Sequence, residues 1–139
     1  MKIYKKRKTA INNVFIDTYN LSVNAKIATY IETYIDCEVL AKKVIGFYKR
    51  ETRKKIPTTL YLPNIINAVH HFSIDLKTEA LVKLFSGGEG IRHNKTPRQL
   101  RNGYVHSKKP ADAKECLENY QLHMHRMKTF IIEIKKYFT

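Results

Sequence analysis

The stretch PADAKECLENYQLHMHRMKTFIIEIKKYF, residues 110–138, decides the fold class. Apolar side chains recur along it in steps of three and four, which is the repeat of one helix face. These are Leu117, Tyr120, Met124, Met127, Ile131, Ile134 and Phe138. Pro110 suits a first helical position, and Lys135 and Lys136 suit a last turn. The pattern predicts one long helix whose stripe faces a bundle core, rather than a coiled-coil dimer.

Three further helices are predicted upstream of this stretch. The first runs from about Leu21 to Glu51, and the second covers residues 63–85 before Gly87 and Gly88. The third is short and covers residues 97–106. Glycine (5) and proline (4) are scarce, which leaves few turns for a sheet protein. The prediction is an all-α fold, an up-and-down helical bundle of four main helices.

The length of 139 residues predicts a single domain. Residues 1–18 form a basic N-terminal arm, and residues 19–139 form the bundle domain. The sequence leaves open whether the arm packs on the body. No apolar run follows the basic start as it would in an export signal, so we expect a cytoplasmic protein. Cys37 and Cys116 are expected to be buried thiols.

The charge predicts an anionic partner. Lysine and arginine total 26 against 12 aspartates and glutamates, which gives +14. RNA, DNA and an anionic membrane are the candidate partners for such a chain, and an inert basic surface is the alternative. No segment approaches the length of a membrane span, so we expect no membrane association.

The third predicted helix has the clearest start signal in the chain. Thr96 and Gln99 have the spacing of a capping box, with Pro97 at the first helical position. The helix then carries Arg101-Asn102-x-x-x-His106. Histidine titrates near neutrality and serves as base or acid, while arginine offers a planar fork to phosphate oxygens. These residue types suit cleavage of RNA by its own 2′-hydroxyl.

One copy of this motif is incomplete as an active site. Arg101 and His106 are separated by about 140° around a helix, whereas Asn102 shares a face with His106. A single histidine is also unable to act as base and acid at once. Two chains that meet at this helix on a two-fold axis would supply two histidines and two arginines. The motif therefore predicts a homodimer.

The Arg101-Asn102-x-x-x-His106 motif resembles the signature of the HEPN family. A helix including residues 72–77, a glycine-containing loop, the motif helix and a long closing helix follow in the order expected of that family, over about residues 25–138. The resemblance implies a metal-independent endoribonuclease with a composite site at a homodimer interface, without a cofactor. It assigns Arg101, Asn102 and His106 as catalytic residues. It also implies a toxin or phage-defence effector, with a nucleotidyltransferase antitoxin as a partner.

Several neighbours of the motif are candidates for RNA binding. Arg98, Lys108 and Lys109 flank it, and His93 lies in the preceding loop. Solvated lysines and a plain loop histidine are the alternatives.

Three further positions within the motif helix have structural interpretations. Gly103 would allow close approach of a partner backbone or of RNA, or it is a neutral packing choice. Tyr104 and Val105 are expected in the core.

Other chemistries find little support in the sequence. Residues 70–71 and 123/125 carry paired histidines, but neighbours at these spacings do not share a helix face, so no metal site is expected. Two alternative functions stay open. One is a HEPN-like module that binds RNA or protein without cutting, and the other is a helical DNA-binding or scaffold protein that uses the basic arm.

Overall fold

The computed structural model describes the backbone of residues 2–57, 59–87, 95–107 and 110–138, and the side chains of these residues except 2–22, 106 and 107. The described ranges contain six helices and no strand. The helices are α1 (Lys2–Thr52), α2 (Leu62–His71), α3 (Thr78–Phe85), α4 (Pro97–Ser107), α5 (Pro110–Glu118) and α6 (Tyr120–Phe138). The predicted all-α helical bundle is confirmed, but two of the four predicted helices are each divided into two.

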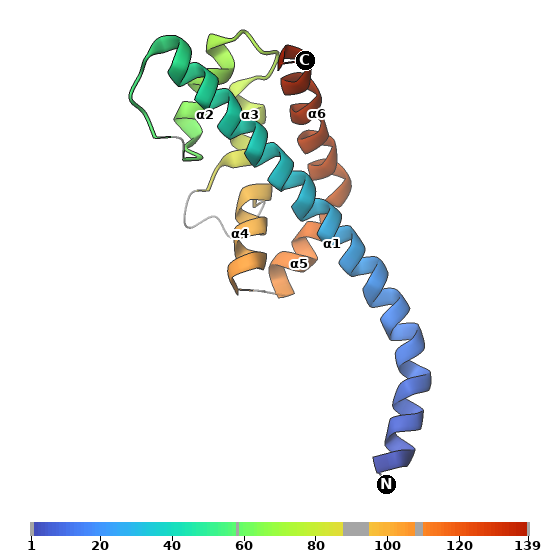
Figure 1. Ribbon diagram of the computed structural model, residues 1–139. Helices are drawn as coiled ribbons and strands as arrows, with labels where there is room; N and C mark the ends of the chain where they lie inside the picture. Colours follow the sequence, from blue (N-terminus) through green and yellow to red (C-terminus); the bar gives the residue numbers. More distant parts are fainter. Residues whose placement is uncertain (1, 58, 88–94, 108–109, 139) are drawn as a thin grey trace.

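Helix α1 is the central element of the bundle. It contacts α2, α4, α5 and α6, and its N-terminal part projects away from the other helices (Figure 1). The predicted helix start near Leu21 is wrong, because the helix begins at Lys2 and includes the backbone of the basic arm. The helix ends before Arg53, whose φ of 56° is left-handed and cannot continue the helix.

The core lies between α1 and the helices around it, with α3 packed on α2, α4 and α6. Its largest fully buried side chains include Tyr30, Tyr34, Ile45, Ile65, Leu81, Leu84, Phe85, Leu100, Met127, Phe130 and Ile134. Most apolar side chains that recur at helical spacing along α1 are buried, whereas Ile35 is 39% exposed. The buried ones are Ile27, Tyr34, Ala41, Val44, Ile45 and Tyr48. Both cysteines are buried and free, as predicted. Burial raises the pKa of the Cys116 thiol to about 12, with the charges of Asp112 and Glu115 adding to the rise.

The predicted second helix is interrupted between α2 and α3. Ser73 adopts a φ of 55°, its N–H donates to the carbonyl of His70 (3.1 Å), and the N–H of Ile74 donates to the carbonyl of Val69 (3.1 Å). This pair of hydrogen bonds is a Schellman motif, and the buried Ile74 and Val69 supply its usual apolar contact. The motif ends α2 and lets the chain turn before α3.

The predicted last helix is interrupted at Asn119, between α5 and α6. The Asn119 side chain donates from Nδ2 to the carbonyl of Glu115 (3.0 Å), which is the local competition that disfavours asparagine within a helix. Helical hydrogen bonds continue across this residue, since His123 N–H donates to the Asn119 carbonyl (2.9 Å). The two segments therefore remain one nearly continuous element.

Helix α6 runs in the same direction as α1. Tyr30 bonds His123, Cys37 bonds the carbonyl of Met127, and Phe47 stacks on Phe138, so contacts advance together along both helices. A simple up-and-down order of four helices would instead make the first and last antiparallel. The difference arises because α2, α3 and α4 divide the returning path among themselves (Figure 1).

The buried sector of α6 is wider than the predicted stripe. Phe130, which lies outside that stripe, is fully buried and packs edge-on against Phe85 with ring centroids 5.1 Å apart. Ile131 and Phe138, which lie on the stripe, are only half-buried. The reason is that α6 packs on both α1 and α3. Over the described part of the chain, no helix has the length and hydropathy needed to cross a membrane.

Candidate functional site on helix α4

Helix α4 carries the motif and begins at the predicted capping box. The Thr96 N–H donates to Oε1 of Gln99 (2.9 Å), and the Gln99 N–H donates to Oγ1 of Thr96 (3.3 Å). The Thr96 hydroxyl also donates to the carbonyl of Ser86, which follows α3. The capping box is therefore confirmed, and it ties the start of α4 to the end of α3.

Two side chains of the first turns hold α4 on the body. Leu100 is fully buried in the core. Arg98 donates from Nη1 to the carbonyl of Phe85 (3.1 Å), the last residue of α3, where a cation also suits the helix dipole. Arg98 was predicted as an RNA contact, and the structure places at least part of its guanidinium in a bond within the chain.

Arg101 and Asn102 are brought together on α4. Both are half-buried, and Nη1 of Arg101 donates to Oδ1 of Asn102 (3.1 Å). The Nε of Arg101 is buried and has no hydrogen-bond partner among the described residues. The stem of the side chain is therefore enclosed, while its terminal nitrogens reach the neighbouring amide.

Tyr34 of α1 lies near these arginines. Its hydroxyl is buried and lacks a hydrogen-bond partner within the described ranges. Burial raises the pKa of Tyr34 above its usual range and Glu38 adds to the rise, while the positive charges of Arg98 and Arg101 offset part of it. The neutral phenol thus lies in a buried environment that senses both cations of α4.

Gly103 lies against α5 of the same chain. A Cβ at this position would overlap the carboxylate of Asp112 and lie 2.9 Å from its Cγ. The Asp112 side chain is 2% exposed and pairs with Nζ of Lys95 at 2.7 Å. The expectation that Gly103 admits a partner or RNA is therefore wrong, because this face of α4 is already packed against Asp112.

A second contact fixes the segment that enters α4. The backbone N–H of Lys95 donates to Oε1 of Glu115 (3.0 Å), so Lys95 meets two carboxylates of α5. Sequence analysis missed this arrangement. The signal in the sequence is the acidic residues that follow Pro110, which suit a helix start in any case and so do not point to Lys95.

The other residues of α4 divide between its two sides. Tyr104 is half-buried and Val105 is 45% exposed, so the predicted core position of Val105 is wrong. Leu100 and Gly103 mark the packed side of the helix. Val105 therefore lies on the outward side, together with part of the Arg101–Asn102 pair.

Four of the predicted site residues fall partly or wholly outside the described structure. The backbone of His106 belongs to α4, one turn after Asn102, but its side chain lies outside the described residues. His93, Lys108 and Lys109 lie outside them entirely. Within the described part of the chain, no three His, Cys, Asp or Glu side chains gather so that they could hold a metal ion.

No family model matches this chain, and no curated protein and no solved structure matches it.

Proposed function

We propose that this chain is a cytoplasmic, metal-independent endoribonuclease of the HEPN type that acts as a homodimer through Arg101, Asn102 and His106. The observation that carries the proposal is the Arg101–Asn102 hydrogen bond (3.1 Å) in a capped helix that continues through His106. Because the opposite side of α4 is packed on the core and on α5, the outward side is available for RNA and a second copy. A toxin or phage-defence role with a nucleotidyltransferase antitoxin belongs to the same proposal.

The proposed chemistry divides among the three side chains. One His106 takes the proton of the 2′-hydroxyl, and the His106 of the second copy gives a proton to the leaving 5′-oxygen. Arg101 stabilises the charge that grows on the phosphate oxygens. Asn102, bonded to Arg101, orients the guanidinium. The net charge of +14 favours RNA association at low salt.

A non-catalytic RNA- or protein-binding module is the second candidate. It is favoured by the buried Nε of Arg101 and by the bond that Nη1 already makes to Asn102, since both reduce the donors left for a phosphate. This candidate predicts RNA binding that weakens with salt and yields no product.

The decisive experiment compares two histidine variants on RNA in EDTA. We expect the wild type and His125→Ala to release fragments that end in 2′,3′-cyclic phosphate, because His125 is exposed and belongs to α6 rather than to the motif helix. His106→Ala should retain the fold by circular dichroism and lose cleavage by about a thousandfold or more. Cleavage that survives in His106→Ala, or that needs a divalent metal, would exclude the proposed mechanism.

A further inference from the structure

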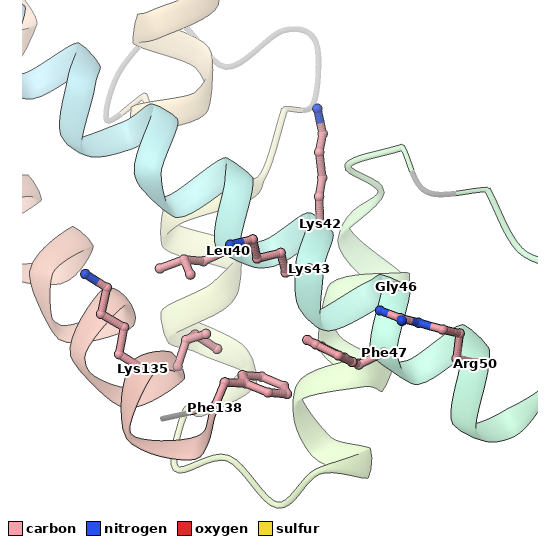
Figure 2. A pocket seen from close by; sticks show the side chains of 9 residues that line it. Leu40, Lys42, Lys43, Gly46, Phe47, Arg50, Lys135 and Phe138 are labelled. Atoms are coloured by element: carbon pink, nitrogen blue, oxygen red, sulfur yellow. The ribbon is translucent and has the colours of Figure 1, made fainter.

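An open groove lies between the C-terminal half of α1 and the C-terminal end of α6, and no residue of α4 lines it (Figure 2). Its volume is about 830 Å³, which is the size of a site for a ligand or for several inserted side chains. The floor is apolar and is formed by Leu40, Phe47, Ile134 and Phe138.

Gly46 leaves the α1 side of the groove open. A Cβ at this position would meet nothing within 4 Å, so the backbone of α1 itself borders open space. Phe47 beside it is 39% exposed. Val39 lies one turn before Lys43 and is 46% exposed, and Ile35 lies two turns before Lys43 and is 39% exposed. The apolar surface therefore continues along α1 beyond the groove.

Cations stand on both sides of the floor. Lys42, Lys43 and Arg50 belong to α1, and Lys135 belongs to α6 (Figure 2). Lys42 pairs with Glu38 at 3.0 Å. The remaining three have no carboxylate partner among the described residues, and the groove has no acidic lining residue there. Three of the four rim cations thus carry positive charge without a carboxylate partner in the described part of the chain.

We propose that this groove binds an acidic amphipathic helix of a partner protein. From Leu40 to Arg50 the groove follows α1 for about 15 Å, which is close to three helical turns. A helix with an apolar stripe and acidic flanks would bury the floor and pair with cations on both rims. The cations are distributed along the groove and on both sides, whereas a fatty acid would need them at one end.

The chemistry of the floor argues against RNA and against a second copy as occupants. The Phe47 ring already stacks on Phe138 (centroids 4.8 Å apart, 17° between planes) and lies under the Arg50 guanidinium at 4.7 Å, so it is poorly placed to stack on a base. Apart from the rim cations, the lining side chains offer no hydrogen-bonding group to a base edge. Two copies joined at this groove would bring like charges together.

The test uses the full chain and synthetic helical peptides of about 16 residues with one leucine stripe. The polar positions of the peptides are glutamate in the first, glutamine in the second and lysine in the third. We expect the acidic peptide to bind in the micromolar range, about tenfold or more tighter than the glutamine peptide, and the lysine peptide not to bind. The His106→Ala variant should bind the acidic peptide like wild type, so this test is separate from that of the ribonuclease.

Two variants locate the binding. Gly46→Leu places its Cβ in open space at the groove and replaces a helical glycine by a better helix former, so the variant should stay folded. Its side chain should occupy part of the groove and weaken binding of the acidic peptide about tenfold. Lys43→Glu should weaken binding of the acidic peptide by a similar factor. Lys128→Glu, at an exposed position of α6 outside the groove, is the matched control for net charge and should leave the affinity within about twofold.

Three results would overturn the proposal. They are the absence of acidic-peptide binding, binding that ignores Gly46→Leu, and an equal loss in Lys43→Glu and Lys128→Glu. Single-stranded RNA of about 12 nucleotides and dodecanoate are added as alternative probes. If either binds tighter than the acidic peptide and depends on Gly46, the groove belongs to nucleic acid or to a lipid instead.

Discussion

Gly103 and Gly46 lie inside helices but face opposite surroundings. Gly103→Ala places a methyl group on the buried Asp112 carboxylate, so we expect the free energy of unfolding to fall by about 2 kcal/mol. Gly46→Ala meets open space and should raise it by up to about 1 kcal/mol, because alanine favours the helix. Urea denaturation of both variants measures the difference. Equal changes of the same sign would contradict the packing described for Gly103.

His123 should make stability depend on pH. Its ring is buried against the Tyr30 hydroxyl (2.7 Å from Nδ1), and burial first, then the charge of Arg126, lowers its pKa to about 4. In the unfolded chain this histidine takes up a proton near pH 6.5, whereas in the folded chain it does so only near pH 4. The free energy of unfolding is therefore unaffected by this group above pH 6.5 and decreases as the pH falls from 6.5 toward 4. The loss amounts to about 3 kcal/mol over that window.

A variant separates this histidine from the other groups that titrate in acid. His123→Gln keeps a hydrogen-bond acceptor for Tyr30 but does not titrate. We expect its free energy of unfolding to change less between pH 6.5 and pH 4.5 than that of the wild type. The same pH dependence in both proteins would rule out His123 as the source.

At this scale the sequence predicted residue types better than contacts. The capping pair Thr96 and Gln99 was predicted correctly, because a capping box is a local pattern. The contact between Gly103 and Asp112 was not, because it depends on how α5 packs on α4. Arg98 shows the same limit, since the carbonyl that it reaches belongs to another helix.

Among the helices, the break between α2 and α3 offers a direct test. Ser73 holds a left-handed φ of 55°, where a side chain costs about 1 kcal/mol relative to glycine. We therefore expect Ser73→Gly to raise the free energy of unfolding by about that amount. Ser86→Gly is the matched control, because Ser86 ends α3 with a φ of −61° and glycine there should be neutral or slightly destabilising. A loss of stability in Ser73→Gly would contradict the Schellman motif.

The interruptions at Ser73 and Asn119 show why the limits of the helices were only partly predictable from the sequence. Apolar periodicity located the helical regions after Leu21 that pack in the core, but it missed the start of α1 and continued through Ser73 and Asn119. Serine replaces the glycine that usually marks a left-handed cap, and the Asn119 side chain acts through a bond to Glu115 that periodicity does not encode. Boundaries set by proline, at Pro97 and Pro110, were correct.

For the whole molecule, the homodimer proposal makes a quantitative prediction. Suppose that each site needs His106 from both copies and that wild-type chains are mixed with about three parts of His106→Ala and allowed to exchange. About a quarter of the wild-type chains then have a wild-type partner, so the activity per wild-type chain should fall to about a quarter. Dilution with an unrelated protein should leave that activity unchanged. Activity strictly proportional to the amount of wild type in both mixtures would point to a site within one chain.

Both cysteines of the chain, Cys37 and Cys116, are fully buried, and burial raises the pKa of each thiol. Thiol-directed dyes and spin labels react with exposed thiolates, so neither natural cysteine should be modified in the folded protein. A single cysteine introduced at an exposed position such as Lys128 would then react selectively, without prior removal of the native pair. The wild-type background is thus ready for distance measurements between labelled copies.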